Sequence, residues 1–186
     1  MSVALRKPNR VTEQEYLEFE NSSQLRHEFV GGVIYAMVGG SDRRNLITGN
    51  VFAALHRGVP ETCHVFSVQM KLRVALADDV DYFYPDIFVA CEPTDRAPLY
   101  REQPCLIIEV ISPSTEREDR RDKFLAYTQI DTLQEYILVA QDVPQIEIMR
   151  RRAAWKPEFR FLADQLELES VNLGILVSDI YRQIAF

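Results

Sequence analysis

Two carboxylates, Asp86 and Glu109, lie next to or within apolar runs, where their chemistry could matter. Asp86 follows Tyr84 and Pro85 and precedes the apolar run 87–91, whereas Glu109 lies inside the apolar run 105–111. An unpaired ionised carboxylate is costly to bury, so such residues usually gain a cation, hydrogen-bond donors or a raised pKa. If the two runs form neighbouring strands, the two acids lie close together. Mg²⁺ and Mn²⁺ typically bind a few carboxylate oxygens and keep several water ligands, so such a pair could supply the protein ligands. The residue types therefore predict a divalent metal site at Asp86 and Glu109.

Each charged candidate also has a plainer interpretation when it is taken alone. Glu109 could end its strand and accept hydrogen bonds from the following turn. Glu28, on the first arm of a predicted hairpin, could be an exposed strand residue. Lys123 ends the charge-rich run 117–123, and lysines in such runs are usually solvated. The site hypothesis depends on all of these residues meeting in one place.

The strand that must carry Glu109 is predicted most clearly. The run 105–111 is apolar apart from the acid and is followed by a Ser-Pro-Ser-Thr turn signal, which is typical of a central strand covered on both faces. Ser114 or Thr115 can then cap a helix with an acidic first turn. On that helix Lys123 and Tyr127 are four residues apart and share a face, so the helix could bring Lys123 back across the sheet.

The remaining elements follow from periodicity and turn signals. Gln69 and Lys71 lie on the polar face of one of the predicted strands and are expected to point toward water. The expected elements are a helix from the Thr12–Glu15 capping box to about Glu20, a hairpin 25–38 turning at Gly31-Gly32, a helix 43–57, one strand 64–75 before a turn at 78–79, an antiparallel pair 135–140 and 145–151, short strands 159–162 and 166–168, and a helix 177–184.

Length and composition favour one soluble unit. The chain has 186 residues, of which 47% are hydrophobic, so we expect a single domain spanning 1–186 with its core at about 10–182. Without a long apolar run or an N-terminal signal-peptide pattern, we expect no membrane contact and a cytoplasmic protein. The net charge of −7 argues against a protein that coats nucleic acid non-specifically.

The cysteines do not suggest a framework of disulfides or a zinc site. Cys63, Cys91 and Cys105 are odd in number, lie among apolar residues and lack close paired spacing. We expect them to be reduced core residues.

The order of these motifs resembles the PD-(D/E)XK nuclease superfamily and, more closely, its bacterial branch of restriction-endonuclease-like proteins. The resemblance covers roughly residues 10–182. It rests on the segments Arg26-His27-Glu28-Phe29-Val30-Gly31-Gly32, Tyr84-Pro85-Asp86-Ile87-Phe88-Val89, Leu106-Ile107-Ile108-Glu109-Val110-Ile111-Ser112-Pro113-Ser114-Thr115, Asp119-Arg120 to Lys123 with Tyr127, and Leu133-Gln134-Glu135-Tyr136. It implies an α/β (α+β) fold with a mixed central sheet flanked by helices and an N-terminal β-hairpin.

The resemblance also implies roles for individual residues. Asp86 matches the first acid, Glu109 the second, and Glu28 an acid contributed by the N-terminal part. The superfamily pattern places a lysine two residues after the second acid, but Ile111 stands there, and Lys123 looks like a lysine that has migrated to the next helix. Asp86 and Glu109 would hold Mg²⁺ or Mn²⁺, while Lys123 would orient or deprotonate the water or stabilise transition-state charge.

The leading interpretation is therefore a metal-dependent endonuclease that acts on DNA. Arg117, Arg120 and Arg121 are expected to contact the nucleic acid, and a homodimer would suit cleavage of two strands. A non-catalytic nucleic-acid-binding or assembly module that keeps the fold is an alternative, because a fold can outlive its activity. A small-molecule hydrolase is a third, although the chain has no Gly-x-Ser-x-Gly motif.

Overall fold

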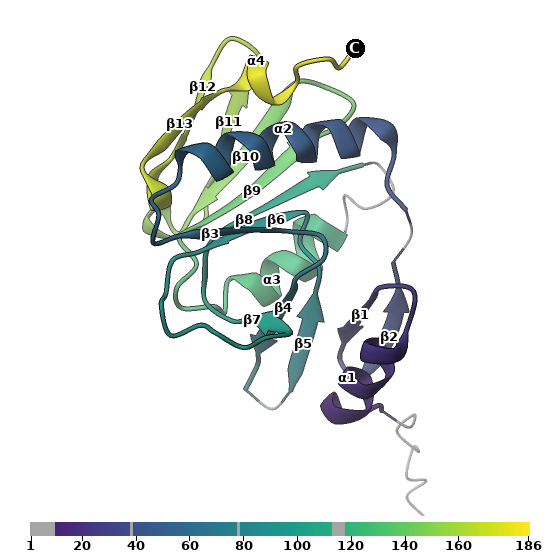
Figure 1. Cartoon of the computed structure of the whole chain (residues 1–186). Helices are drawn as coiled ribbons and strands as arrows, with labels where there is room; N and C mark the ends of the chain where they lie inside the picture. Colours follow the sequence, from purple (N-terminus) through teal and green to yellow (C-terminus); the bar gives the residue numbers. More distant parts are fainter. Residues whose placement is uncertain (1–9, 38, 78, 113–117) are drawn as a thin grey trace, which may run out of the picture.

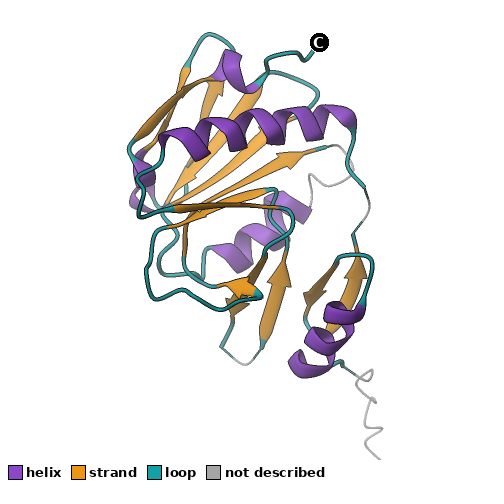
Figure 2. Cartoon of the chain, in the orientation of Figure 1, coloured by secondary structure: helices purple, strands orange, loops and turns teal. Residues whose placement is uncertain are grey.

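A mixed six-stranded sheet forms the centre of the structure, a computed structural model that describes residues 10–37, 39–77, 79–112 and 118–186 (Figures 1 and 2). The strand order is β11-β10-β9-β8-β6-β3, and neighbours are antiparallel except for the parallel pair β8 and β9. The strands are β3 (His64–Ser67), β6 (Ile87–Ala90), β8 (Pro104–Ile111), β9 (Glu135–Ala140), β10 (Gln145–Arg150) and β11 (Pro157–Phe161). The predicted mixed central sheet is confirmed.

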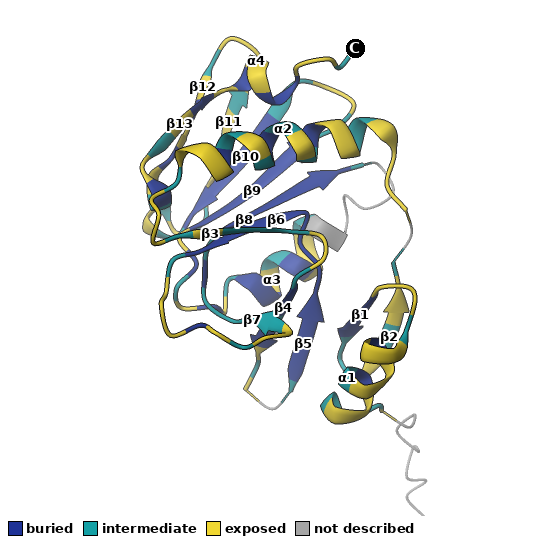
Figure 3. Ribbon diagram, viewed as in Figure 1, coloured by how far each residue is buried: buried dark blue, intermediate teal, exposed yellow. Residues whose placement is uncertain are grey.

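Strand β8 is buried on both faces, as its composition predicts (Figure 3). Leu106, Ile108 and Val110 pack toward α2 (Asp42–Gly58), α4 (Val177–Ile180) and the β12 (Gln165–Leu168) and β13 (Leu173–Leu176) hairpin. Ile107 and Ile111 pack on the other side, toward α3 (Phe124–Tyr127). Because side chains alternate along a strand, Glu109 belongs to this second face, beside α3.

A second, five-stranded sheet contributes the N-terminal part of the site. Its order is β2-β1-β5-β4-β7, and its strands are β1 (His27–Val30), β2 (Val33–Ala36), β4 (Lys71–Ala75), β5 (Val80–Phe83) and β7 (Tyr100–Arg101). The predicted hairpin is confirmed as β1 and β2, with Gly31 at φ 58° and Gly32 at φ 80° in its turn. Helix α1 (Glu13–Ser22) precedes it and begins with the predicted capping box of Thr12 and Glu15.

The prediction of one strand over 64–75 was wrong. The chain turns at Val68 to Met70, where the Met70 amide donates to the Ser67 carbonyl, and the two halves join different sheets as β3 and β4. The alternation of side chains continues through the turn, so periodicity did not reveal it. The strands β5, β7 and β13 were not predicted at all.

The helices differ from expectation mainly at their ends. Helix α2 matches its prediction within one residue at each end. The predicted caps Ser114 and Thr115 lie outside the described residues, and the segment Glu118–Lys123 is π-helical before α3 continues it. The last helix was predicted to 184 but ends at Ile180. No helix formed by the described residues is long and apolar enough to span a membrane.

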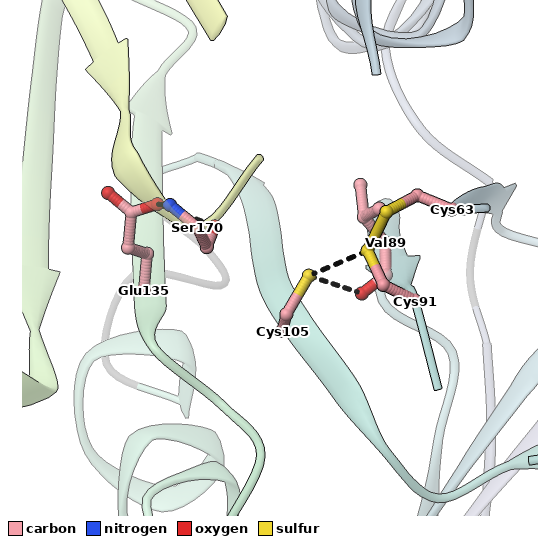
Figure 4. Close-up of a disulfide and its surroundings, with 6 residues drawn as sticks. All are labelled: Cys63, Val89, Cys91, Cys105, Glu135 and Ser170. Atoms are coloured by element: carbon pink, nitrogen blue, oxygen red, sulfur yellow. Dashed lines mark hydrogen bonds between the residues drawn. A yellow bond between two sulfur atoms is a disulfide. The ribbon is translucent and has the colours of Figure 1, made fainter. Parts of the chain in front are cut away.

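The prediction that all cysteines are reduced was also wrong, because Cys63 and Cys91 form a disulfide (Figure 4). The β3–β6 register pairs His64 with Ala90, so the next pair outward is Cys63 and Cys91. This proximity arises from strand pairing and leaves no trace in local spacing. Cys105 is free, its Sγ lies 3.5 Å from that of Cys91, and burial raises its pKa to about 11.

Candidate active site

Asp86 and Glu109 lie side by side because their strands pair. The β6–β8 register places Ile87 opposite Ile108, so Asp86, just before β6, faces Glu109. The Asp86 amide donates to Glu109 Oε2 at 3.2 Å, and the Val110 amide donates to Asp86 Oδ2 at 2.8 Å. Each carboxylate is thus bonded to the strand that carries the other, and the two acids meet as the sequence predicted.

The second oxygen of Glu109 receives two donors from the helical segment that ends in α3. Lys123 Nζ lies 3.2 Å and Tyr127 Oη lies 3.1 Å from Glu109 Oε1. Glu109 has 0% of its surface exposed, and Lys123 is also buried. A buried carboxylate needs such a cation and such donors to offset its lost hydration. The plainer interpretations, a strand-end Glu109 and a solvated Lys123, are therefore both wrong.

Glu28 on β1 completes the group that surrounds the lysine. Its Oε1 lies 3.4 Å from Lys123 Nζ and also accepts a hydrogen bond of 3.2 Å from the Tyr84 amide. Glu28 is buried, so it is not the exposed strand residue that the plainer interpretation described. Lys123 therefore bridges Glu28 from the five-stranded sheet and Glu109 from the six-stranded sheet.

Arg44, which the sequence did not single out, contacts both carboxylate oxygens of Asp86. Its Nε donates to Asp86 Oδ1 at 3.0 Å and its Nη2 to Oδ2 at 2.7 Å. The residue lies in the first turn of α2, which Ser41 caps by accepting from the Arg44 amide. A cation in the first turn of a helix opposes the helix dipole, and that unfavourable position was the available signal.

A second layer of buried polar residues supports Tyr84, two residues before Asp86. Tyr84 Oη donates to Glu20 Oε1 at 2.7 Å, and His27 Nδ1 lies 2.9 Å from Glu20 Oε2. Burial, together with this bond to Glu20, raises the pKa of Tyr84. Lys71 was expected to face water but is buried, with its ammonium 5.9 Å from the centre of the Tyr84 ring, and desolvation lowers its pKa.

The three arginines that were predicted to contact nucleic acid differ in their surroundings. Arg117 lies outside the described residues. Arg120 forms an ion pair with Glu147 of β10, and Arg121 is exposed. The structure therefore leaves Arg121 accessible and gives Arg120 an acidic partner that a phosphate would have to replace.

A cavity of about 690 Å³ opens above this cluster. Glu28, Asp86, Arg44 and Lys123 line it, but Glu109 does not, because it lies beneath Lys123. The expectation that all four predicted residues line one cavity is therefore met for three of them. The remaining wall combines apolar and polar side chains, namely Gln24, Leu25, Arg26, Tyr35, Ala36, Met37, Gly39, Gly40, Ser41, Asn45, Thr48, Val68 and Gln69.

The donor set is chemically suited to a hard divalent cation. Asp86 and Glu109 offer carboxylate oxygens from adjacent strands, and Mg²⁺ typically takes one or two carboxylates and keeps several waters. Within the described residues, no group of three or more His, Cys, Asp or Glu side chains is arranged to hold a metal ion. The guanidinium of Arg44 instead supplies the positive charge at Asp86. An ion held by both acids would therefore need Arg44 to leave Asp86 and the buried Glu109 to become accessible beside Lys123.

Comparisons with known proteins agree with this fold. A family model described as "Uma2: Putative restriction endonuclease" matches residues 13–176. Two relatives from Synechocystis sp. are named only as uncharacterized proteins. The first, slr1290, is 33% identical over 181 residues, which cover 95% of this chain and 94% of that protein. The second, sll1609, is 33% identical over 140 residues, which cover 74% and 78%.

One solved structure shares the architecture. It is the crystal structure of a "putative nuclease belonging to DUF820" from Anabaena variabilis, which aligns with a TM-score of 0.73. The alignment covers 92% of this chain and 97% of that one at 16% sequence identity. At that identity the likeness shows the fold, which is the restriction-endonuclease-like fold expected from the sequence.

Proposed function

Since this chain belongs to the Uma2 family of restriction-endonuclease-like proteins, we propose that it is a metal-dependent nuclease that hydrolyses DNA phosphodiester bonds. The observation that carries the proposal is the position of Lys123 Nζ, 3.2 Å from Glu109 and 3.4 Å from Glu28, with Asp86 just before the adjoining strand. Ile111 stands two residues after Glu109, where the superfamily pattern has a lysine. Lys123, on the following helical segment, places its ammonium group beside the same acid.

Each residue of the site has a separate role in the proposed hydrolysis. Asp86 and Glu109 would hold a Mg²⁺ or Mn²⁺ ion, which when bound supplies positive charge to the phosphoryl oxygens and makes water a better nucleophile. Lys123 stabilises the negative charge that develops in the transition state, and Glu28 fixes the direction of the lysine side chain. Tyr127 holds Glu109 in place through its hydroxyl group.

The proposal extends to assembly and substrate. Two symmetric active sites suit the cleavage of both strands of a duplex, so we propose a homodimer related by two-fold symmetry. The family description names restriction endonucleases, which makes DNA the proposed substrate, and a matched RNA substrate tests that choice. Analytical ultracentrifugation tests the dimer.

A nicking assay with supercoiled plasmid tests the proposed activity. We expect the wild type to nick DNA with Mg²⁺ or Mn²⁺ and not with EDTA, and Glu109→Gln to lose on the order of a hundredfold or more in rate. Glu167→Gln on β12, an exposed acid in another part of the molecule, is the matched control and should keep full activity. A wild type that is inactive with both ions, or a Glu109→Gln variant as active as the wild type, would refute the proposal.

A second candidate function is a nucleic-acid-binding module without catalysis. It is favoured by the full engagement of the acids, since Asp86 is paired with Arg44 through both oxygens, and Glu109 with Lys123 and Tyr127. Binding of Mn²⁺ separates the two candidates. A module would bind DNA without binding the ion, whereas a nuclease needs both.

A further inference from the structure

Arg44 occupies the part of Asp86 that a cation would use. Its two nitrogens contact the two carboxylate oxygens at 3.0 and 2.7 Å, in the side-by-side geometry that a guanidinium and a carboxylate favour. The Asp86 side chain is only 4% exposed, so this arginine provides much of the charge that a buried acid requires. The pair holds Asp86 in a fixed orientation before any ion arrives.

Arg44 also borders the cavity. The Arg44 side chain is 21% exposed, and it lines the cavity together with Arg26 and Lys123. It extends from the N-terminal turn of α2, where the positive end of the helix dipole favours anions. Arginine binds phosphate with the same two-pronged geometry as it binds carboxylate. A movement of this one flexible side chain would take it from Asp86 to a phosphate in the cavity.

We propose that Arg44 is a positioning residue that exchanges partners, holding Asp86 when no divalent ion is bound and a phosphate group of the nucleic acid when one is. This inference rests on the proposed nuclease function. The physical reason is that two cations cannot share the same two carboxylate oxygens, since like charges at such short range repel each other strongly. The ion displaces the guanidinium, and the phosphodiester that enters the cavity gives it a new partner.

The exchange couples ion binding to nucleic-acid binding. The ion frees Arg44 for the phosphate, and the phosphate removes a competitor from Asp86. Each ligand therefore strengthens the binding of the other by the same factor, as thermodynamic linkage requires. A residue that only stabilised the fold would not produce this reciprocity.

Calorimetric titration with Mn²⁺ alone tests the first half of the exchange. We expect Arg44→Gln to bind Mn²⁺ on the order of tenfold more tightly than the wild type, because the ion no longer has to break a charged pair. Arg44→Lys, which keeps the charge but cannot contact both oxygens side by side, should fall between them. Arg43→Gln is the matched control, since the neighbouring arginine points toward Asp142 and the Ala185 carbonyl, and it should leave Mn²⁺ affinity unchanged.

Fluorescence anisotropy with a hydrolysis-resistant phosphorothioate DNA oligonucleotide tests the second half. In the wild type, Mn²⁺ should raise the affinity for the oligonucleotide several-fold above its value in EDTA, and Arg44→Gln should lose most of that gain. Thermal unfolding with and without Mn²⁺ establishes that each variant is folded. If Arg44→Gln is unfolded, Arg44→Lys decides, and it must bind Mn²⁺ more tightly than the wild type.

The possible outcomes separate this inference from the proposed function. If the wild type binds Mn²⁺ and the Arg44 variants bind it no more tightly, Arg44 does not compete with the ion, and only the exchange is overturned. If Mn²⁺ raises DNA affinity equally in the wild type and in Arg44→Gln, the exchange is again overturned while the proposed nuclease function stands. If neither the wild type nor the variants bind Mn²⁺, the exchange and the metal-dependent nuclease fall together.

Discussion

Lys123 is the residue on which the buried charges of the site depend, because two acids from different sheets share its ammonium group. We predict that Lys123→Met lowers the free energy of unfolding by about 3–5 kcal/mol, the usual cost of leaving one partner of a buried ion pair unmatched. Urea unfolding measures the loss.

The double variant Lys123→Met/Glu109→Gln provides the control. It removes the charge that Lys123→Met leaves behind, so it should be more stable than Lys123→Met alone. If the losses of the two single variants simply add, the coupling between Lys123 and Glu109 that the 3.2 Å contact implies is absent.

At the residue scale, sequence predicted the acids of the site better than its cations. Asp86 and Glu109 stood out because acids are rare next to buried apolar runs, and Glu28 and Lys123 because their positions match a known pattern. Arg44 was missed, since its unfavourable place in the first turn of a helix is a weak signal and it otherwise resembles any surface charge. Its partner is set by how α2 lies against β6, which one sequence does not encode locally.

At the element scale, periodicity predicted the central strands and α2 but not the places where the chain changes direction without glycine or proline. The turn between β3 and β4 contains Val68, Gln69 and Met70, none of which is a strong turn residue. Strand β5 was missed because Asp81 interrupts its apolar character. That acid is buried, and its Oδ1 accepts a 2.8 Å hydrogen bond from the Gly31 amide in the β1–β2 turn.

Asp81 should make the attachment of this hairpin sensitive to pH. Burial raises its pKa, and the hydrogen bond from Gly31 opposes the rise without cancelling it. A raised pKa means that the folded state holds a proton more readily than the unfolded state, so this residue's contribution to stability falls as pH rises above the ordinary value of 3.8 through the folded pKa.

We predict that Asp81→Asn, which keeps the oxygen that accepts from Gly31, removes this cost. The free energy of unfolding of the variant minus that of the wild type should be larger at pH 7 than at pH 4. Urea unfolding at the two pH values measures the difference. A variant whose disadvantage grew toward pH 7 would show that the ionised carboxylate stabilises the turn.

At the scale of the whole molecule, the fold class was predictable, because the apolar central strands and the order of the motifs allowed few arrangements. The Cys63–Cys91 disulfide was not, since it depends on the pairing of β3 with β6. Cys105 lies beside it, but a thiol whose pKa is raised to about 11 is almost entirely protonated at neutral pH. It is therefore a poor nucleophile toward that disulfide.

Net charge limits how the molecule can hold DNA. The chain carries −7, and Glu13, Glu15 and Glu18 make α1 acidic. Basic groups near the cavity, including Arg26, Arg44 and Lys123, offer only a local patch. Binding should therefore be weak, because affinity for DNA grows with the number of phosphates that lysine and arginine neutralise.

We predict that the logarithm of DNA affinity falls with the logarithm of salt concentration with a slope of roughly −3 to −4, corresponding to about three or four phosphate contacts. The double variant Arg120→Ala/Arg121→Ala removes two positive charges, so it should lower the affinity for DNA and make the slope shallower. Its affinity for Mn²⁺ should be unchanged, because Arg120 pairs with Glu147 and Arg121 is exposed. Arg152→Ala, which removes a surface arginine paired with Glu169, is the matched control and should change neither quantity. Anisotropy titrations over a range of salt concentrations provide the measurement. An unchanged affinity and slope in the double variant would mean that DNA approaches the acids from another side of the molecule, past the β1–β2 hairpin that carries Glu28.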